Sequence, residues 1–262
     1  MKRLEIIELW KAIGWDSIAS YHKHLSSSAD MIVLDLLDPN VVDPVEFWCA
    51  AEDHFGTDSI CNRSSSFDIL SIKESNKVNH DIAMCAGMLL QLDICAQHVY
   101  KLFGSVDIAE IGAGHGSFRL AYSNIQNRFL DKTSYAGFDI IKREESQIMV
   151  GDIDGNFSQD QVFLYTDQFN LFYSANTFQH LSKHQIKKYL NQVYKMLPHG
   201  GYFCMMYVKD IERTYHYGQA VEIFSIDELK TFVKQVGFEI FGSSTMNIKN
   251  SITPYCFVLK KE

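Results

Sequence analysis

Beyond residue 104, short apolar runs alternate with longer stretches in which apolar residues recur at helical spacing. The runs have the length of β-strands, and the stretches between them have the period of amphipathic helices. This alternation is typical of a mainly parallel sheet with helices on both faces, which binds ligands at the carboxyl ends of its strands. The expected strands are residues 106–111, 135–138, 171–174, 202–207, 238–241 and 255–259, and the expected helices are residues 117–126, 183–196 and 226–236.

The chain before residue 104 has a helical pattern. Asp43-Pro44 provides an N-cap followed by a proline at the first helical position, and Gly104 provides a C-cap after a long apolar segment. Because that segment is apolar on most faces, we expect it to be buried on more than one side, by packing on the sheet, as a lid or as the face of a homodimer. The predicted elements are helices at residues 4–13, 44–55 and 76–103 and a loop at residues 57–75.

The change of pattern divides the chain of 262 residues into a helical region, 1–103, and an α/β domain, 104–262. With 47% hydrophobic and 21% charged residues, the chain can form a core without metals or disulfides. Its six cysteines form no CxxC pair and have no zinc spacing. Four acidic residues, Asp152, Asp154, Asp210 and Glu212, also lack a spacing diagnostic of a metal site, so no metal site is predicted.

The net charge and the hydropathy of the chain limit the kinds of partner that it is expected to bind. The formal net charge of -8 repels a phosphate backbone, so we expect no nucleic-acid substrate. The longest apolar run, residues 82–90, is too short to span a bilayer. The start Met1-Lys2-Arg3 is followed at once by Glu5 and Glu8, which makes a poor signal peptide. We therefore expect a cytoplasmic protein that binds neither nucleic acid nor membrane.

The segment Glu110-Ile111-Gly112-Ala113-Gly114-His115-Gly116 follows the first expected strand and precedes a helix that opens at Ser117. Glycines let the backbone approach a ligand closely, and a helix start offers unpaired N–H groups to an anion. The dinucleotide fingerprint GxGxxG would need a glycine where Ser117 stands, which argues against an NAD-dependent oxidoreductase. A carboxylate at Glu110 suits a ligand with an ammonium group, whereas it would repel a pyrophosphate.

The segment Ala109 to Gly116 resembles motif I of the class I S-adenosylmethionine (SAM)-dependent methyltransferases. Five later segments resemble further parts of that family in the same order, over roughly residues 104 to 260. This resemblance implies a Rossmann-like methyltransferase fold, in which a mostly parallel sheet has seven strands with an antiparallel last strand. The later segments are residues 137–140, 151–153, 169–174, 197–203 and 225–238.

The resemblance also implies the cofactor, SAM, and the residues that hold it. It assigns Asp139 to the two ribose hydroxyls, Asp152 with Ile153 to the adenine, and Glu110 to the cofactor site through its fixed place before the glycines. The remaining expected cofactor contacts are Gly112, Ala113, Gly114, Gly116, Ile140 and Ser174.

Two features depart from the family pattern. The family usually has Phe-Asp where this chain has Phe169-Asn170, so any acid role at that position is lost. Only about a dozen residues separate Asp139 from Asp152, too few for a full helix and a strand. Either the second helix is reduced to a turn and the third strand is residues 148–152, which we prefer, or that strand is residues 162–166.

The candidate catalytic residues are histidines, because methyl transfer to a hydroxyl needs a general base or a metal. His180 follows the fourth expected strand, at the carboxyl edge of the sheet, although it could instead cap the next helix. His216 lies between tyrosines in the segment before the last helix, where this family often contacts its acceptor. His115, inside the glycine turn, is expected to shape the cofactor pocket.

The stretch Ser174 to His180 is similar to bacterial sugar O-methyltransferases. The leading interpretation is therefore methyl transfer to a hydroxyl of a small polar acceptor such as a sugar. Transfer to an amine, which needs no strong base, is the alternative within the family. A SAM-binding protein without turnover is the alternative outside it.

Overall fold

In the computed structural model, the residues described are 2–12, 44–55, 80–114, 128–129, 132–142, 147–151, 155–175, 177–178, 181–209, 213–216, 219–222, 224–245 and 253–262. Two expected elements, the loop at residues 57–75 and the helix at residues 117–126, lie outside them. Among the helices within them, none combines the length and apolarity that crossing a membrane requires.

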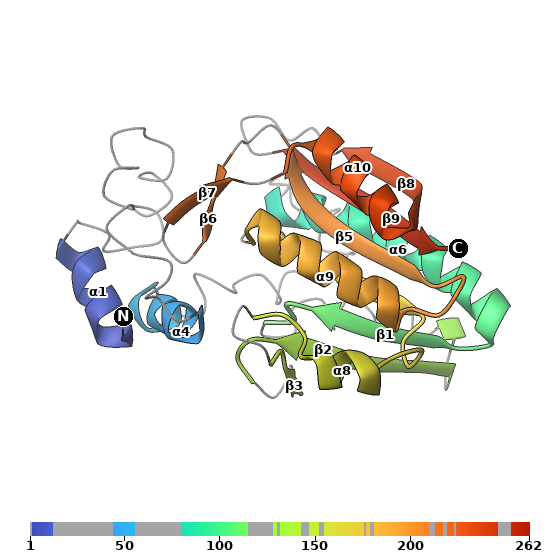
Figure 1. Ribbon diagram of the computed structural model, residues 1–262, viewed down its shortest axis with the longest axis horizontal. Coiled ribbons are helices and arrows are strands. Elements are labelled where there is room, and N and C mark those ends of the chain that lie inside the picture. The colour runs from blue at the N-terminus through green and yellow to red at the C-terminus, as the bar shows by residue number, and fades with distance from the viewer. Residues whose placement is uncertain are drawn as a thin grey trace, which may run out of the picture.

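A seven-stranded sheet forms the centre of the fold, in the order β3-β2-β1-β4-β5-β9-β8 (Figure 1). The first five strands in this order run parallel to one another, and β9 runs antiparallel to both of its neighbours. This confirms the predicted sheet. The strands are β1 (Val106–Ile111), β2 (Thr133–Asp139), β3 (Ile148–Met149), β4 (Leu171–Ser174), β5 (Tyr202–Lys209), β8 (Phe238–Thr245) and β9 (Thr253–Lys261).

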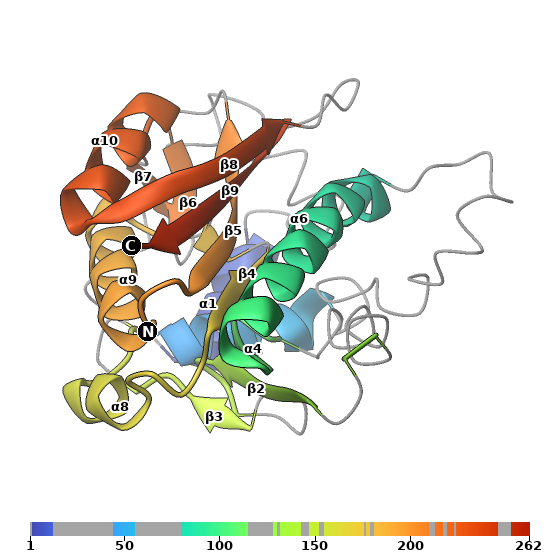
Figure 2. The ribbon, with the colours of Figure 1, turned by 90° about the vertical axis from the view of Figure 1, so that its right-hand side faces the viewer.

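Helices cover both faces of the sheet (Figure 2). The helix α6 (His80–Phe103) lies on one face, and α8 (Gln159–Leu164), α9 (Lys183–Met196) and α10 (Ile226–Val236) lie on the other. The strands β1 and β4 are therefore buried along nearly their whole length, because helices cover the side chains on both of their faces.

The helix α6 packs against β1, β4, β5 and β9. Four of its side chains are almost completely buried in a cluster with residues of these strands, and Gly104 ends the helix with a positive φ of 74°. The expected packing of this segment on the sheet is confirmed. Among the α6 side chains that the structure describes, those of residues 91–103, the buried ones are Leu92, Cys95, Ala96 and Val99.

Two N-terminal helices, α1 (Arg3–Ala12) and α4 (Pro44–Phe55), pack on each other. The rings of Trp10 and Phe47 meet edge to face at 5.4 Å, and both side chains are buried. Figure 1 shows this pair beyond the carboxyl ends of the parallel strands, on the same side as a two-stranded ribbon of β6 (Arg213–His216) and β7 (Gln219–Glu222).

The structure settles the position of the third strand. β3 pairs with the end of β2, placing Ile148 beside Phe138 and Met149 beside Asp139. The alternative strand at residues 162–166 is wrong, because that part of the chain continues the short helix α8. This helix begins with a capping box in which the Ser158 hydroxyl accepts from the Gln161 backbone N–H and the Gln161 side chain accepts from the Ser158 backbone N–H.

Candidate active site at the carboxyl edge of the sheet

The turn after β1 is bonded to the end of β2 through three consecutive backbone amides. Gly112 and Ala113 donate to the carbonyl oxygen of Phe138 at 2.8 and 3.1 Å, and Gly114 donates to Oδ2 of Asp139 at 2.7 Å. Gly112 and Gly114 have positive φ angles of 76° and 52°, which glycine adopts at little cost. The predicted glycine turn therefore lies at the carboxyl edge of the sheet, beside the predicted acid.

The other side of this turn rests on the segment that follows β4. Ser174 and Thr177 both direct their hydroxyls at the carbonyl oxygen of Ile111, at 2.9 and 3.3 Å. A Cβ added at Gly112 would lie 1.9 Å from Oγ1 of Thr177, so only a glycine fits. Ser174, predicted as a cofactor contact, is completely buried and supports the turn. The sequence analysis did not single out Thr177; its place shortly after a buried strand is the one signal it offered.

Asp139 ends β2, and its carboxylate is oriented by two backbone groups. Its Oδ2 accepts from Gly114 and its Oδ1 accepts from the N–H of Ile141 at 3.1 Å. The carboxylate is thus fixed at the edge of the glycine turn.

Glu110 lies one strand away and in a different environment. It is 1% exposed, and the Tyr135 phenol donates a hydrogen bond to its Oε2. Burial raises the pKa of the Glu110 carboxyl group to about 8; the hydrogen bond from Tyr135 lowers this pKa, and the negative charge of Asp139 raises it. The site therefore holds one half-buried acid and one fully buried acid of raised pKa.

Two other predicted contacts also lie here. Ala113 is buried within the turn, and Ile140 is half-buried against the hydrophobic cluster on the side of the sheet opposite α6. Predicted site residues that lie outside the described residues are His115, Gly116, Asp152, Ile153 and His180; of His216 the structure describes the backbone, which ends β6.

No protein-family model and no curated protein matches the chain. Among solved structures, it is similar to the 1,6-didemethyltoxoflavin N1-methyltransferase of Burkholderia thailandensis, with a TM-score of 0.50 and 14% identity, over 86% of this chain and 93% of that one. A SAM-dependent methyltransferase of Clostridium acetobutylicum has a TM-score of 0.47 and 10% identity, over 74% and 96% of the two chains. The N-methyltransferase NodS of Bradyrhizobium japonicum has a TM-score of 0.46 and 12% identity, over 78% and 97%.

The chain has a class I methyltransferase fold. At 14% identity, the similarity to the Burkholderia enzyme concerns the arrangement of strands and helices alone.

Asn170, where this family usually has an acid, lies at the amino end of β4, the edge of the sheet opposite the glycine turn. Its side chain is buried, with Oδ1 accepting from the N–H of Asp107 at 2.9 Å and Nδ2 donating to the carbonyl oxygen of Ser105 at 3.1 Å. An aspartate could not make the second bond, because an ionised carboxylate has no donor. The asparagine therefore stabilises the start of β1 and β4, and its side chain takes no part in the candidate site.

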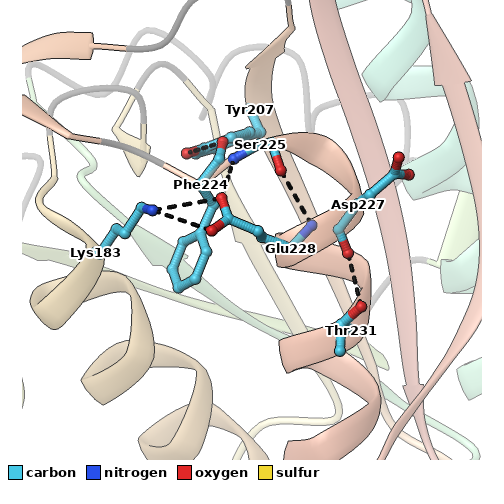
Figure 3. A network of polar contacts seen from close by, with 7 residues as sticks. All are labelled: Lys183, Tyr207, Phe224, Ser225, Asp227, Glu228 and Thr231. Atoms are coloured by element: carbon cyan, nitrogen blue, oxygen red, sulfur yellow. Dashed lines mark hydrogen bonds and ion pairs between the residues drawn. The ribbon is translucent and has the colours of Figure 1, made fainter.

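A polar network closes the base of the β6–β7 ribbon at the carboxyl edge (Figure 3). The buried Tyr207 of β5 donates to the carbonyl oxygen of Phe224 at 3.1 Å, which joins the two ends of the segment that carries the ribbon. Oε2 of Glu228 accepts from the N–H of Ser225 at 2.8 Å, and Oε1 of Glu228 lies 3.2 Å from Nζ of Lys183. This network joins the N-terminus of α9 to the N-terminus of α10.

One hollow of about 510 Å³ lies at the opposite edge of the sheet. It is bordered by residues at the starts of β1 and β2 and in the segment before β4, so it is remote from the glycine turn and its acids. Within the described part of the chain, no group of three or more His, Cys, Asp or Glu side chains is placed to hold a metal ion. The hollow is lined by Asp107, Ser134, Leu164, Tyr165, Asp167, Gln168 and Phe169.

The close approach at Gly112 predicts an unequal effect of alanine at two glycines with similar φ. Gly104→Ala places a methyl group in open space, so it should cost only the strain of a positive φ, about 1–2 kcal/mol. Gly112→Ala adds a collision with Thr177 and should cost about 1–3 kcal/mol more. Urea unfolding of both variants measures the difference, and equal losses would contradict the contact.

Glu110→Gln should change how stability depends on pH. The pKa of Glu110 in the folded protein lies above the usual 4.5, so folding favours the protonated acid. The resulting contribution to the free energy of unfolding is complete below about pH 4.5 and is lost as the pH rises through about 8. The free energy of unfolding of the wild type should therefore fall over this range, and the Gln variant, which cannot ionise, should lose less. Urea unfolding at about pH 5 and pH 8.5 tests this, with the exposed Glu8→Gln as control. Identical profiles for Glu110→Gln and the wild type would mean that Glu110 is already ionised in the folded protein.

Proposed function

We propose that the protein is a SAM-dependent methyltransferase that acts on a hydroxyl group of a small polar acceptor. The observation that supports this best is the pair of acids around the glycine turn. Asp139 offers two oxygens at the edge of the turn, and Glu110 lies buried two residues before its first glycine. This spacing of charge fits a ligand that carries both ribose hydroxyls and an ammonium group.

The residues that are present fit this cofactor. Because Gly114 presents no side chain and the space beside its Cα is open, the backbone there can come into contact with a ligand. Asp139 would accept hydrogen bonds from the two ribose hydroxyls, and Glu110 would face the ammonium group of the amino-acid part. When bound, the cofactor supplies an electrophilic methyl group on a sulfonium, and the protein's share of catalysis is largely to position the acceptor in line with it.

The need to remove a proton from the acceptor distinguishes the hydroxyl hypothesis from the amine hypothesis. A hydroxyl ionises little near neutral pH and gains from a general base, and His180 occupies the segment between β4 and α9 that leads from the carboxyl edge of the sheet. We assign this role to His180, with His216 of the ribbon segment as the second candidate. An amine acceptor would need neither.

We further propose that residues 1 to about 75 form a helical cap over the acceptor pocket. This is supported by the place of α1 and α4 beyond the carboxyl ends of the strands, on the same side as the ribbon (Figure 1). The Trp10–Phe47 contact joins the two helices into one unit. An acceptor bound at the carboxyl edge would then lie between this unit and the sheet.

Titration calorimetry tests the cofactor. The protein should bind SAM and S-adenosylhomocysteine and should not bind NAD. Asp139→Ala should weaken S-adenosylhomocysteine binding at least about tenfold, because a hydrogen bond to a charged group contributes roughly 1.5–3 kcal/mol. Asp227→Ala, whose carboxylate is almost fully exposed on α10, is the control and should bind normally. Tight NAD binding without SAM binding would end the proposal.

A methyl-transfer assay with a panel of sugars and small amines tests the acceptor and the base. His180→Gln should keep its affinity for S-adenosylhomocysteine and lose about 10²–10⁴-fold in turnover. The wild-type rate should rise with pH through an apparent pKa near 6.5, the ordinary value for histidine, and the variant should lack this limb. His199→Gln, at the far edge of the sheet, is the control. Unchanged turnover in His180→Gln would move the base to His216, and methylation of amines alone would refute the hydroxyl acceptor.

A further inference from the structure

Tyr135 and Glu110 meet because of the register of two parallel strands. Ile108 lies opposite Tyr135, and Glu110 lies opposite Gly137. Side chains alternate between the faces of a strand, so Tyr135, Gly137 and Asp139 share one face of β2, which is the face toward Glu110. Gly137 has no side chain, so the Glu110 carboxyl group can reach diagonally to the phenol of Tyr135.

This face of the sheet is the one covered by α6. Ile108 belongs to the buried cluster that includes the α6 side chains, and Tyr135 packs against that cluster. Glu110 is therefore separated from solvent by hydrophobic packing, and the phenol of Tyr135 is a donor that can stabilise its negative charge.

Few other titratable groups face this carboxyl group from the described residues. Asp139 lies on the same face of β2 and repels a charge on Glu110. Tyr173, the register partner on β4, is a phenol, which supplies no positive charge. From α6, Cys95 belongs to the same cluster, but its thiol accepts from the thiol of Cys204 on β5. None of these described groups is a cation, and the ammonium group of a ligand would supply a positive charge beside Glu110.

We propose that Tyr135 is a positioning residue for the cofactor's amino group, and that the Tyr135–Glu110 pair releases one proton when a ligand with an ammonium group binds. This inference rests on the proposed function. In the empty site the carboxyl group is neutral and bonded to the phenol. On binding, its O–H bond breaks and the proton passes to the solvent buffer, which leaves a carboxylate that accepts from both the ammonium group and Tyr135.

Proton release has a direct thermodynamic signature. Near pH 7 the affinity for S-adenosylhomocysteine should rise about tenfold per pH unit, and this slope should flatten above about pH 8. The heats of binding measured at pH 7 in phosphate and in Tris should differ. Each buffer takes up nearly one released proton, and the two buffers have different heats of ionisation. Methylthioadenosine is the ligand control: it has the nucleoside part but lacks the amino-acid part with its ammonium group, so its binding should show neither effect.

Variants separate the two residues of the pair. Tyr135→Phe removes the donor to the carboxylate and should weaken S-adenosylhomocysteine binding at pH 7 by about tenfold to a hundredfold, with the pH slope displaced to higher pH. Its affinity for methylthioadenosine should be unchanged. Glu110→Gln should bind without proton release and without the pH slope. Tyr202→Phe, on the same face of the sheet but at the amino end of β5, should behave as the wild type.

The outcomes distinguish this inference from the function on which it rests. If the wild type binds S-adenosylhomocysteine with the same heat in both buffers, the proton release is refuted while the cofactor assignment stands. If Tyr135→Phe binds as the wild type does, Tyr135 has no positioning role. If neither ligand binds to the wild type, the proposed function itself fails. The two-ligand comparison needs no variant, so it decides the proton release even where a substitution impairs folding.

Discussion

The candidate site depends on one close approach, in which the chain after β1 passes between the end of β2 and the segment after β4. At Gly112 the backbone N–H donates to the Phe138 carbonyl on one side, and the missing side chain makes room for Thr177 on the other. A larger residue would separate the three strand ends. This contact therefore holds the glycine turn and Asp139 in one place, so the positions of the acids follow from how closely the strands can pack.

The two acids have different properties because the sheet gives them different surroundings. Glu110 lies inside β1, where the neighbouring strands and hydrophobic packing remove water and raise its pKa. Asp139 lies at the strand end, where two backbone N–H groups stabilise its charge. The carboxyl edge of the sheet thus holds a buried acid of raised pKa and an acid whose carboxylate is held by two backbone N–H groups.

Much of this fold follows from the sequence. The strands β1 and β4 and the helices α9 and α10 have the predicted bounds, because each is a continuous apolar run or an amphipathic stretch ended by a cap or a turn. Contacts that depend on which residues of neighbouring strands lie side by side were harder to predict. The roles of Tyr135 and Thr177 were not predicted, because each depends on a residue of another strand that lies beside it. The helix α8 escaped notice because six residues show no clear period; its beginning is determined by one capping box. The β6–β7 ribbon was missed because its pairing lies outside the main sheet.

The change of pattern near residue 104 separates the helical region from the α/β domain, but the hydrophobic core includes side chains from both sides of this boundary. Side chains of α6 form one cluster with Ile108 of β1 and Tyr173 of β4, and Tyr135 of β2 packs against this cluster. Glu110 projects from the same face of β1 as Ile108. The helix that precedes the boundary therefore belongs to the core on the face of the sheet that carries Glu110, and burial is the main cause of the raised pKa of Glu110. The N-terminal region is thus connected to this face of the sheet through the packing of a single helix.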